Sequence, residues 1–313
     1  MLLRLCTTLT RVYPVLMVLA VLAALQAPAA FRPLAPVVPW LVAAVMFLMG
    51  LTTGPADFRL VLSRPLVVGV AVAARYAVMP LVALLVTRAL ALPPGLAAGF
   101  LLTGSCPSAV ASNVMTFVSR GNTALSVTVS ACNTLLSPLL TPALFLLLAG
   151  RSVPVHAGAM FADIARIVLL PVAAGAGLRA LLPGPVRRLV PFLPALSTIL
   201  LLLIVAPGIA LNARSFAAVG ALAFVGVALH NALGLLAGFA AGRHVLRLPR
   251  PDAQAVSFEV GMENTGLAIA LVLAAGLDPL AIIPPAIFGA WDNISGAALA
   301  RFWAARPVDP RSS

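Results

Sequence analysis

Apolar segments follow one another along almost the whole chain, separated by short stretches rich in Arg, Pro and Gly. A segment of about 20 apolar residues is long enough to cross the hydrocarbon core of a bilayer as a helix. Charged residues make up only 9% of the sequence, whereas a soluble domain carries about 25%. The pattern therefore predicts an all-α polytopic protein of the lipid bilayer, with one transporter-sized domain over residues 1–313.

About ten spans can be delimited from the breaks between apolar segments. They are Val12–Gln26, Val37–Leu51, Leu66–Leu92, Gly95–Val118, Asn122–Ala149, Ala157–Leu182, Val190–Leu211, Phe216–Leu246, Ala253–Gly276 and Leu280–Ala304. Two runs of five, over about residues 1–150 and 151–313, would have opposite orientations because five is odd. The first segment resembles a signal peptide, but we interpret it as an uncleaved span because the ten-span count requires it.

The arginines predict how these spans are oriented. Alternate loops and the C-terminal tail hold Arg4, Arg11, Arg59, Arg64, Arg120, Arg179, Arg187, Arg188, Arg243, Arg247, Arg250, Arg301, Arg306 and Arg311, and the opposite loops hold Arg32, Arg88, Arg151 and Arg214. Positive residues favour the cytoplasmic side, so we expect both termini in the cytoplasm of a cell with a bacterial-type inner membrane. Although the net charge is +12, its spread over segment ends argues against nucleic acid. Nothing in the pattern indicates an obligate protein partner.

Two glutamates interrupt the ninth span. Glu259 and Glu263 are the only glutamates in the chain, and their spacing of four residues puts them on one helix face. Gly261, Asn264 and Gly266 are poor helix formers, so we expect the helix to break here. A carboxylate at the centre of a membrane costs about 2.5–3.5 kcal/mol and is usually functional. We therefore predict a cation site of a transporter.

The fourth span contains a matching interruption at Pro107, which is surrounded by small polar residues. Each interrupted span is the fourth in its run of five. Interrupted segments at corresponding places of two halves are the best sequence pointer to a transporter site. Taken alone, the break at Pro107 could be an ordinary proline kink, and the one at Gly261 could be an unrelated glycine cluster. Two breaks at corresponding positions favour broken helices that cross at mid-membrane.

Oxygen-bearing side chains near these breaks could hold a sodium ion. A dehydrated hard cation needs several oxygen ligands, from carboxylates, amides and hydroxyls. The candidate set is Ser112, Asn113, Ser126, Ser130 and Glu259. Each serine alone would more often bond its own helix backbone, so the argument rests on the set.

Arg75 is a second anomaly, because it lies inside the third span and far from either end. A buried arginine needs a carboxylate partner. The candidates within spans are Glu259, Glu263, Asp163 and Asp292.

Many short motifs then occur in one order along nearly the whole chain. They are Met49-Gly50-Leu51-Thr52 with Asp57-Phe58, Tyr76 with Met79-Pro80, Cys106-Pro107, Ala111 to Thr116, Arg120-Gly121-Asn122 with Leu125-Ser126, Ser137 to Pro142, Leu229-His230-Asn231, Glu259 to Met262 with Asn264, and Asn293 to Gly296. With them the chain resembles the bacterial branch of the bile acid:sodium symporter family. The resemblance implies ten spans in two inverted repeats, a panel and a core domain, two sodium sites behind the crossing and an organic-anion substrate.

The resemblance also implies a role for the anomalous residues. The first sodium site coincides with the serine, asparagine and Glu259 set. The second implied site consists of Glu259, backbone oxygens at Val260 and Met262, and two glutamines, which here are Arg75 and Glu263. We hypothesise that Arg75 and Glu263 form an ion pair in place of the second ion. The rival is a second site strengthened by Glu263, with Arg75 turned toward the substrate cavity.

The implied substrate position falls on Ser108, Ala109, Val110, Asn264, Asp292 and Asn293. A half-helix beginning near Ser108 would present free N–H groups to a carboxylate. Asp292 stands where the family has a histidine, and Val110 where it often has a threonine. We therefore expect a small carboxylate, such as a keto or hydroxy acid, more than a large sulfonated steroid.

The predicted function is sodium-coupled symport of an organic anion by alternating access. The alternative is a sodium-independent or proton-coupled carrier of the same fold, in which Glu259 or Glu263 titrates. A membrane-embedded enzyme would need a metal cluster, an aspartate-rich site or an activated nucleophile, and the scattered His and Cys residues provide none.

Overall fold

The computed structural model describes residues 2–54, 61–150 and 156–306. In these ranges the chain forms helices joined by short connections and one two-residue β-bridge, which confirms the all-α expectation. Five residues that carried part of the sequence argument lie outside the described residues: Asp57, Phe58, Arg59, Arg151 and Arg311.

Most helical segments follow the predicted spans within a few residues, but α1 begins at Leu2, well before the predicted start at Val12. The first half contains α1 (Leu2–Gln26), α2 (Pro28–Phe31), η1 (Arg32–Val37), α3 (Val38–Thr52), α5 (Pro65–Ala89), α6 (Pro94–Ser105), α7 (Ala111–Val118) and α8 (Thr123–Ala149). The second half contains α9 (Ala157–Ile164), η3 (Ala165–Leu169), α10 (Leu170–Leu181), α11 (Pro183–Leu189), η4 (Val190–Phe192), α12 (Leu193–Leu211), α13 (Ala213–Ala240), η5 (Ala241–Val245), α14 (Arg250–Gly261), α15 (Thr265–Ala274), η6 (Pro279–Ile282) and α16 (Ile283–Ala304).

The outer surface of the helices is apolar, as a lipid-facing surface must be. Within the described residues, 6 helical segments are long and apolar enough to cross a membrane. Leu62, Leu147 and Leu181 are each more than three quarters exposed, and no monomer in water would expose so many large apolar side chains. The chain is therefore a multi-pass membrane protein, while the count of ten spans and the inverted repeat stay predictions.

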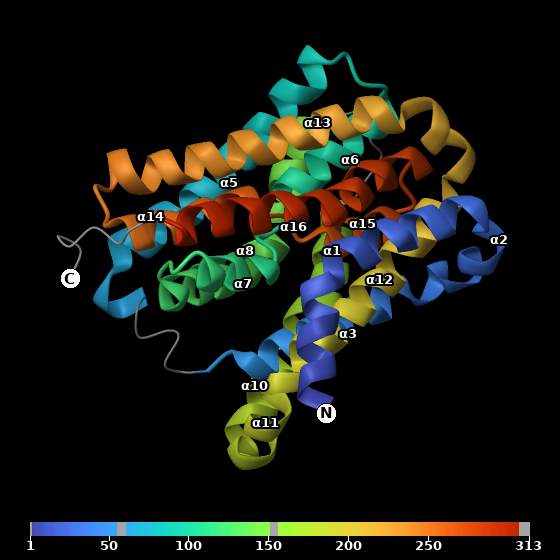
Figure 1. The fold of residues 1–313 in the computed structure, drawn as a ribbon. Coiled ribbons are helices and arrows are strands. Elements are labelled where there is room, and N and C mark those ends of the chain that lie inside the picture. Colours follow the sequence, from blue (N-terminus) through green and yellow to red (C-terminus); the bar gives the residue numbers. More distant parts are fainter. Residues whose placement is uncertain (1, 55–60, 151–155, 307–313) are drawn as a thin grey trace.

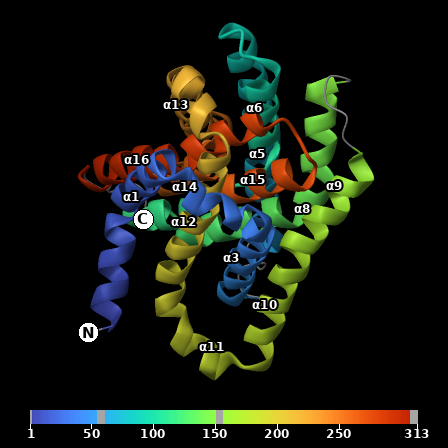
Figure 2. The ribbon, with the colours of Figure 1, turned by 90° about the vertical axis from the view of Figure 1, so that its right-hand side faces the viewer.

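One group of helices consists of α1, α3, α10 and α12, which pack mainly on one another (Figures 1 and 2). The closest approach is between α3 and α10, where glycines replace side chains. A methyl group on Gly50 would lie 2.2 Å from the Val172 carbonyl oxygen, and one on Gly175 would lie 2.3 Å from that of Phe47. We call these four helices the panel bundle.

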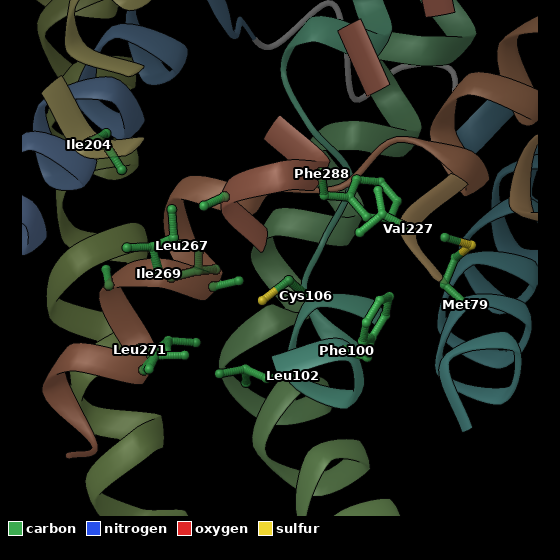
Figure 3. Packing of buried hydrophobic residues seen from close by; sticks show 14 of the residues in the cluster. Met79, Phe100, Leu102, Cys106, Ile204, Val227, Leu267, Ile269, Leu271 and Phe288 are labelled. Atoms are coloured by element: carbon green, nitrogen blue, oxygen red, sulfur yellow. The ribbon is translucent and has the colours of Figure 1, made fainter. Parts of the chain in front are cut away.

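The other group consists of α5 to α8 and α13 to α16, with α13 lying along α14, α5 and α16 (Figure 1). We call it the core bundle. Every residue from Asp252 to Val272 is buried, so α14 and α15 form its centre. Figure 3 shows Phe100, Phe288 and Met79 from three different helices packing beside this centre. Burial on all sides explains why these two short helices need no apolar stripe of their own.

Both predicted helix breaks are present in the core bundle. The first separates α6, which ends at Ser105, from α7, which begins at Ala111. The second separates α14, which ends at Gly261, from α15, which begins at Thr265. Pro107 cannot donate a helical hydrogen bond, and Met262 is extended with φ −106 and ψ 133. The chain therefore leaves the helix at both places and leaves backbone groups that need new partners.

Candidate functional site

The two breaks supply each other's missing backbone hydrogen bonds. Ser108 and Glu263 form an antiparallel bridge. The Ala109 N–H donates to the Met262 carbonyl at 3.1 Å, and the Asn264 N–H donates to the Pro107 carbonyl at 3.0 Å. Because buried peptide groups must be paired, this crossing fixes the two interrupted segments against each other. We call the paired residues 107–109 and 262–264 the crossover.

Glu259 reaches the crossover from the last turn of α14 and is fully buried. Its Oε1 lies 2.5 Å from Ser112 Oγ and 2.6 Å from Ser126 Oγ. Its Oε2 accepts a hydrogen bond of 2.6 Å from Ser108 Oγ. Asn113 joins the group through its Oδ1, 2.8 Å from Ser126 Oγ. The carboxylate therefore meets only neutral oxygen groups within hydrogen-bonding distance among the described residues.

These residues, Glu259 with Ser108, Ser112, Asn113 and Ser126, form what we call the serine cluster. The sequence predicted four of them, whereas Ser108 was assigned to the substrate position. Ser130 is buried one turn further along α8, and its hydroxyl has no hydrogen-bond partner among the described residues. Its hydroxyl makes no hydrogen bond to the cluster, so its role as a fifth oxygen ligand stays a prediction.

The sequence did not indicate a role at this site for two residues near the serine cluster, Asn133 and Tyr76. Asn133 Nδ2 donates to Ser108 Oγ at 3.2 Å, and its Oδ1 has no described hydrogen-bond partner. The Tyr76 hydroxyl donates to the Asn133 carbonyl at 2.6 Å. Asn133 follows Ser126 by seven residues, which is two helical turns, so helical spacing alone could have placed it on the same face.

Arg75 reaches the other side of the crossover from the middle of α5 and is fully buried. It forms the predicted ion pair with Glu263. Its Nη1 donates to the Val260 carbonyl at 2.7 Å, and its Nη2 contacts the carbonyls of Cys106 and Pro107. We call Arg75 with these four oxygen acceptors the arginine cage. The Arg75 side chain therefore points toward the crossover and Glu263. The alternative arrangement, in which Arg75 turns toward a substrate cavity, is not observed.

The predicted substrate residues lie in the crossover, directly after it or on α16. Ala109 and Val110 are half-buried and precede α7. The half-helix begins at Ala111 rather than near Ser108, because Ser108 and Ala109 are extended and paired with the second break. Asn264 caps α15 by accepting from the Leu267 N–H at 3.1 Å, and its amide lies 3.9 Å from Met46 Sδ of α3.

Asp292 and Asn293 lie on α16 and are buried. The Asn293 amide donates to the Asp292 carboxylate and to the Gly289 carbonyl, both at 2.8 Å. The backbone of Glu263 lies next to the Asp292 carboxylate. Asp292 therefore borders the second break.

A separate cavity of about 510 Å³ lies at the ends of α5, α6 and α8. Arg88, Asp278 and Gly95 are among its lining residues, and none of the predicted substrate residues contributes to it. It lies at the opposite end of α6 from the crossover, so we do not assign the substrate to it.

Comparison with known proteins identifies the family. Residues 39–219, more than half of the chain, match the model of the Sodium Bile acid symporter family. The chain is 40% identical over 273 residues to the uncharacterized sodium-dependent transporter YocS of Bacillus subtilis (strain 168), covering 87% of this chain and 84% of the relative. It is 33% identical to the probable sodium/metabolite cotransporter BASS1 (chloroplastic) of Arabidopsis thaliana, covering 82% of this chain and 63% of the relative. The chain therefore belongs to the sodium bile acid symporter family.

Proposed function

We propose that the protein is a sodium-coupled symporter of a small organic anion. The observation that carries this proposal is the serine cluster, in which a buried carboxylate is surrounded by neutral oxygen groups at the crossing of two broken helices. The names of two relatives also refer to sodium: one is an uncharacterized sodium-dependent transporter and the other a probable sodium/metabolite cotransporter.

The chemistry of the serine cluster fits a monovalent hard cation. One sodium ion balances the single negative charge of Glu259, and hydroxyl and amide oxygens complete its coordination. Ser112, Asn113, Ser126 and Ser130 are the proposed neutral ligands. A cation of higher charge would be left with uncompensated charge in a site that holds one carboxylate.

In this proposal the anion binds where the crossover faces the panel bundle. Ala109 and Val110 directly precede α7, whose N-terminal partial positive charge favours a carboxylate. Asn264, Asp292 and Asn293 border the same region. The nearby Asp292 disfavours a multiply charged anion, so we propose a small monocarboxylate such as a keto or hydroxy acid.

The transport cycle then consists of rocking of the panel bundle against the core bundle. The serine cluster and the arginine cage both lie within the core bundle, so an ion site can remain assembled while the panel bundle moves. The proposed topology has ten spans in two inverted repeats, with both termini in the cytoplasm of a cell with a bacterial-type inner membrane. The ion pair of Arg75 and Glu263 replaces the second sodium site that family resemblance implies.

The test is uptake by proteoliposomes that contain the purified protein. An inward sodium gradient should drive accumulation of radiolabelled keto or hydroxy monocarboxylates, and a potassium gradient of the same size should not. Glu259→Gln should abolish the sodium-driven component. Uptake driven equally well by a proton gradient in sodium-free buffer would establish the proton-coupled alternative and overturn the proposal.

A further inference from the structure

The arginine cage has the composition of a cation site. Cys106 follows the last residue of α6, and Val260 belongs to the last turn of α14, so both carbonyls lie at helix C-termini. Each helix C-terminus carries roughly half a negative charge. The Glu263 carboxylate adds a full one, and all of these oxygens point at one guanidinium. Such a group of buried oxygens requires a cation.

Arg75 supplies that cation permanently. A guanidinium does not lose its proton in proteins, and α5 carries this one in its middle, so it cannot leave as a solute ion can. The fit is incomplete, since Arg75 Nε and Glu263 Oε1 have no hydrogen-bond partner among the described residues. The guanidinium therefore leaves one carboxylate oxygen of the cage without a hydrogen bond from the described residues.

We infer that the arginine cage is a latent sodium site filled by Arg75, so that the wild-type protein binds one sodium ion per chain. This inference rests on the proposed function, because it assigns the bound ion to the serine cluster. It also determines the net charge moved in each transport cycle. One sodium ion transported with one monocarboxylate carries no net charge. Removing the guanidinium should open the cage to a second sodium ion.

Equilibrium binding of radiolabelled sodium to the detergent-purified protein tests this count without any organic substrate. We expect the wild type to bind one sodium ion per chain with a Hill coefficient near one. Arg75→Ala should bind two, because three carbonyls and the Glu263 carboxylate become free to coordinate. Arg75→Lys, which keeps a cation in the cage, should still bind one.

A second variant keeps the test decisive if Arg75→Ala does not fold. Arg75→Gln combined with Glu263→Gln removes both charges at once and leaves two amide oxygens beside the carbonyls, so it should also bind two ions. Two sodium ions in the wild type, or one in both cage variants, would overturn the inference. Absence of sodium binding in the wild type, or binding that Glu259→Gln leaves unchanged, would instead overturn the proposed function.

Discussion

The two glutamates of the second break lie four residues apart, yet their surroundings have opposite character. Glu259 in the serine cluster meets three hydroxyl groups, whereas Glu263 in the arginine cage meets a guanidinium. Both carboxylates are fully or almost fully buried. The difference teaches that the structure supplies a fixed positive charge to Glu263, whereas Glu259 has only neutral groups within hydrogen-bonding distance among the described residues.

The same contrast appears in the helices that supply the partners of each glutamate. The side chains of α7 and α8 face Glu259 and carry hydroxyls and amides, which can coordinate an ion and release it. The cage uses backbone carbonyls and a side chain of α5, which stay in place as long as the helices do. In the proposed function, the serine cluster is therefore the exchangeable ion site, and the arginine cage keeps its own cation.

The largest expected effect comes from removing the charge of the serine cluster. Glu259→Gln should weaken sodium binding about 100-fold or more, because the loss of one partner of a buried charge pair costs about 3–5 kcal/mol. The measurement is radiolabelled-sodium binding to the purified protein. Asp252→Asn, at the other end of α14 and paired with the half-exposed Arg64, is the matched control. Equal affinities in the two variants would remove Glu259 from the site.

The next effect concerns stability in sodium-free buffer. Arg75→Gln and Glu263→Gln should each destabilise the fold by about 3–5 kcal/mol, because each leaves a buried charge without its partner. The combined Arg75→Gln, Glu263→Gln variant should lose less unfolding free energy than either single variant. Glu259→Gln should also lose less than Arg75→Gln and less than Glu263→Gln. Denaturant unfolding of the detergent-purified variants measures all four. Additive losses at Arg75 and Glu263 would show that the ion pair contributes nothing.

A smaller effect is expected from single ligands of the serine cluster. Ser126→Ala should weaken sodium binding about 10-fold to 100-fold, since a hydrogen-bonding group next to a charge contributes about 1.5–3 kcal/mol. Ser137→Ala is the control, because Ser137 is buried on the same helix but bonds to the Thr134 carbonyl. If the two substitutions weaken sodium binding equally, the loss comes from altered packing of α8 and not from a missing ion ligand.

The smallest effect is expected from the membrane voltage. If Arg75 limits transport to one sodium ion per monocarboxylate, the cycle moves no net charge. An inside-negative potassium diffusion potential, set with valinomycin, should then leave the initial uptake rate unchanged. The same potential should accelerate uptake by the Arg75→Gln, Glu263→Gln variant, which carries an additional positive charge inward. Acceleration of the wild type would show that a second sodium ion enters with the substrate.

The sequence by itself determined the helices, both breaks and most members of the serine cluster. Apolar length defines a membrane helix, Pro107 and the glycine-rich stretch around Gly261 interrupt one, and Ser126 with Ser130 share a face through helical spacing. These are local properties, because they depend on residues within one or two turns of each other.

Only the tertiary structure decided how the broken segments meet. Four carboxylates were candidates for Arg75, and the packing of α5 against the crossover selected Glu263. Pairing of the two breaks moved the start of α7 to Ala111, which turned Ser108 toward Glu259. Such contacts join residues more than a hundred positions apart, and no helical period relates them. Their distances are set by how helices pack, and that is a property of the whole bundle.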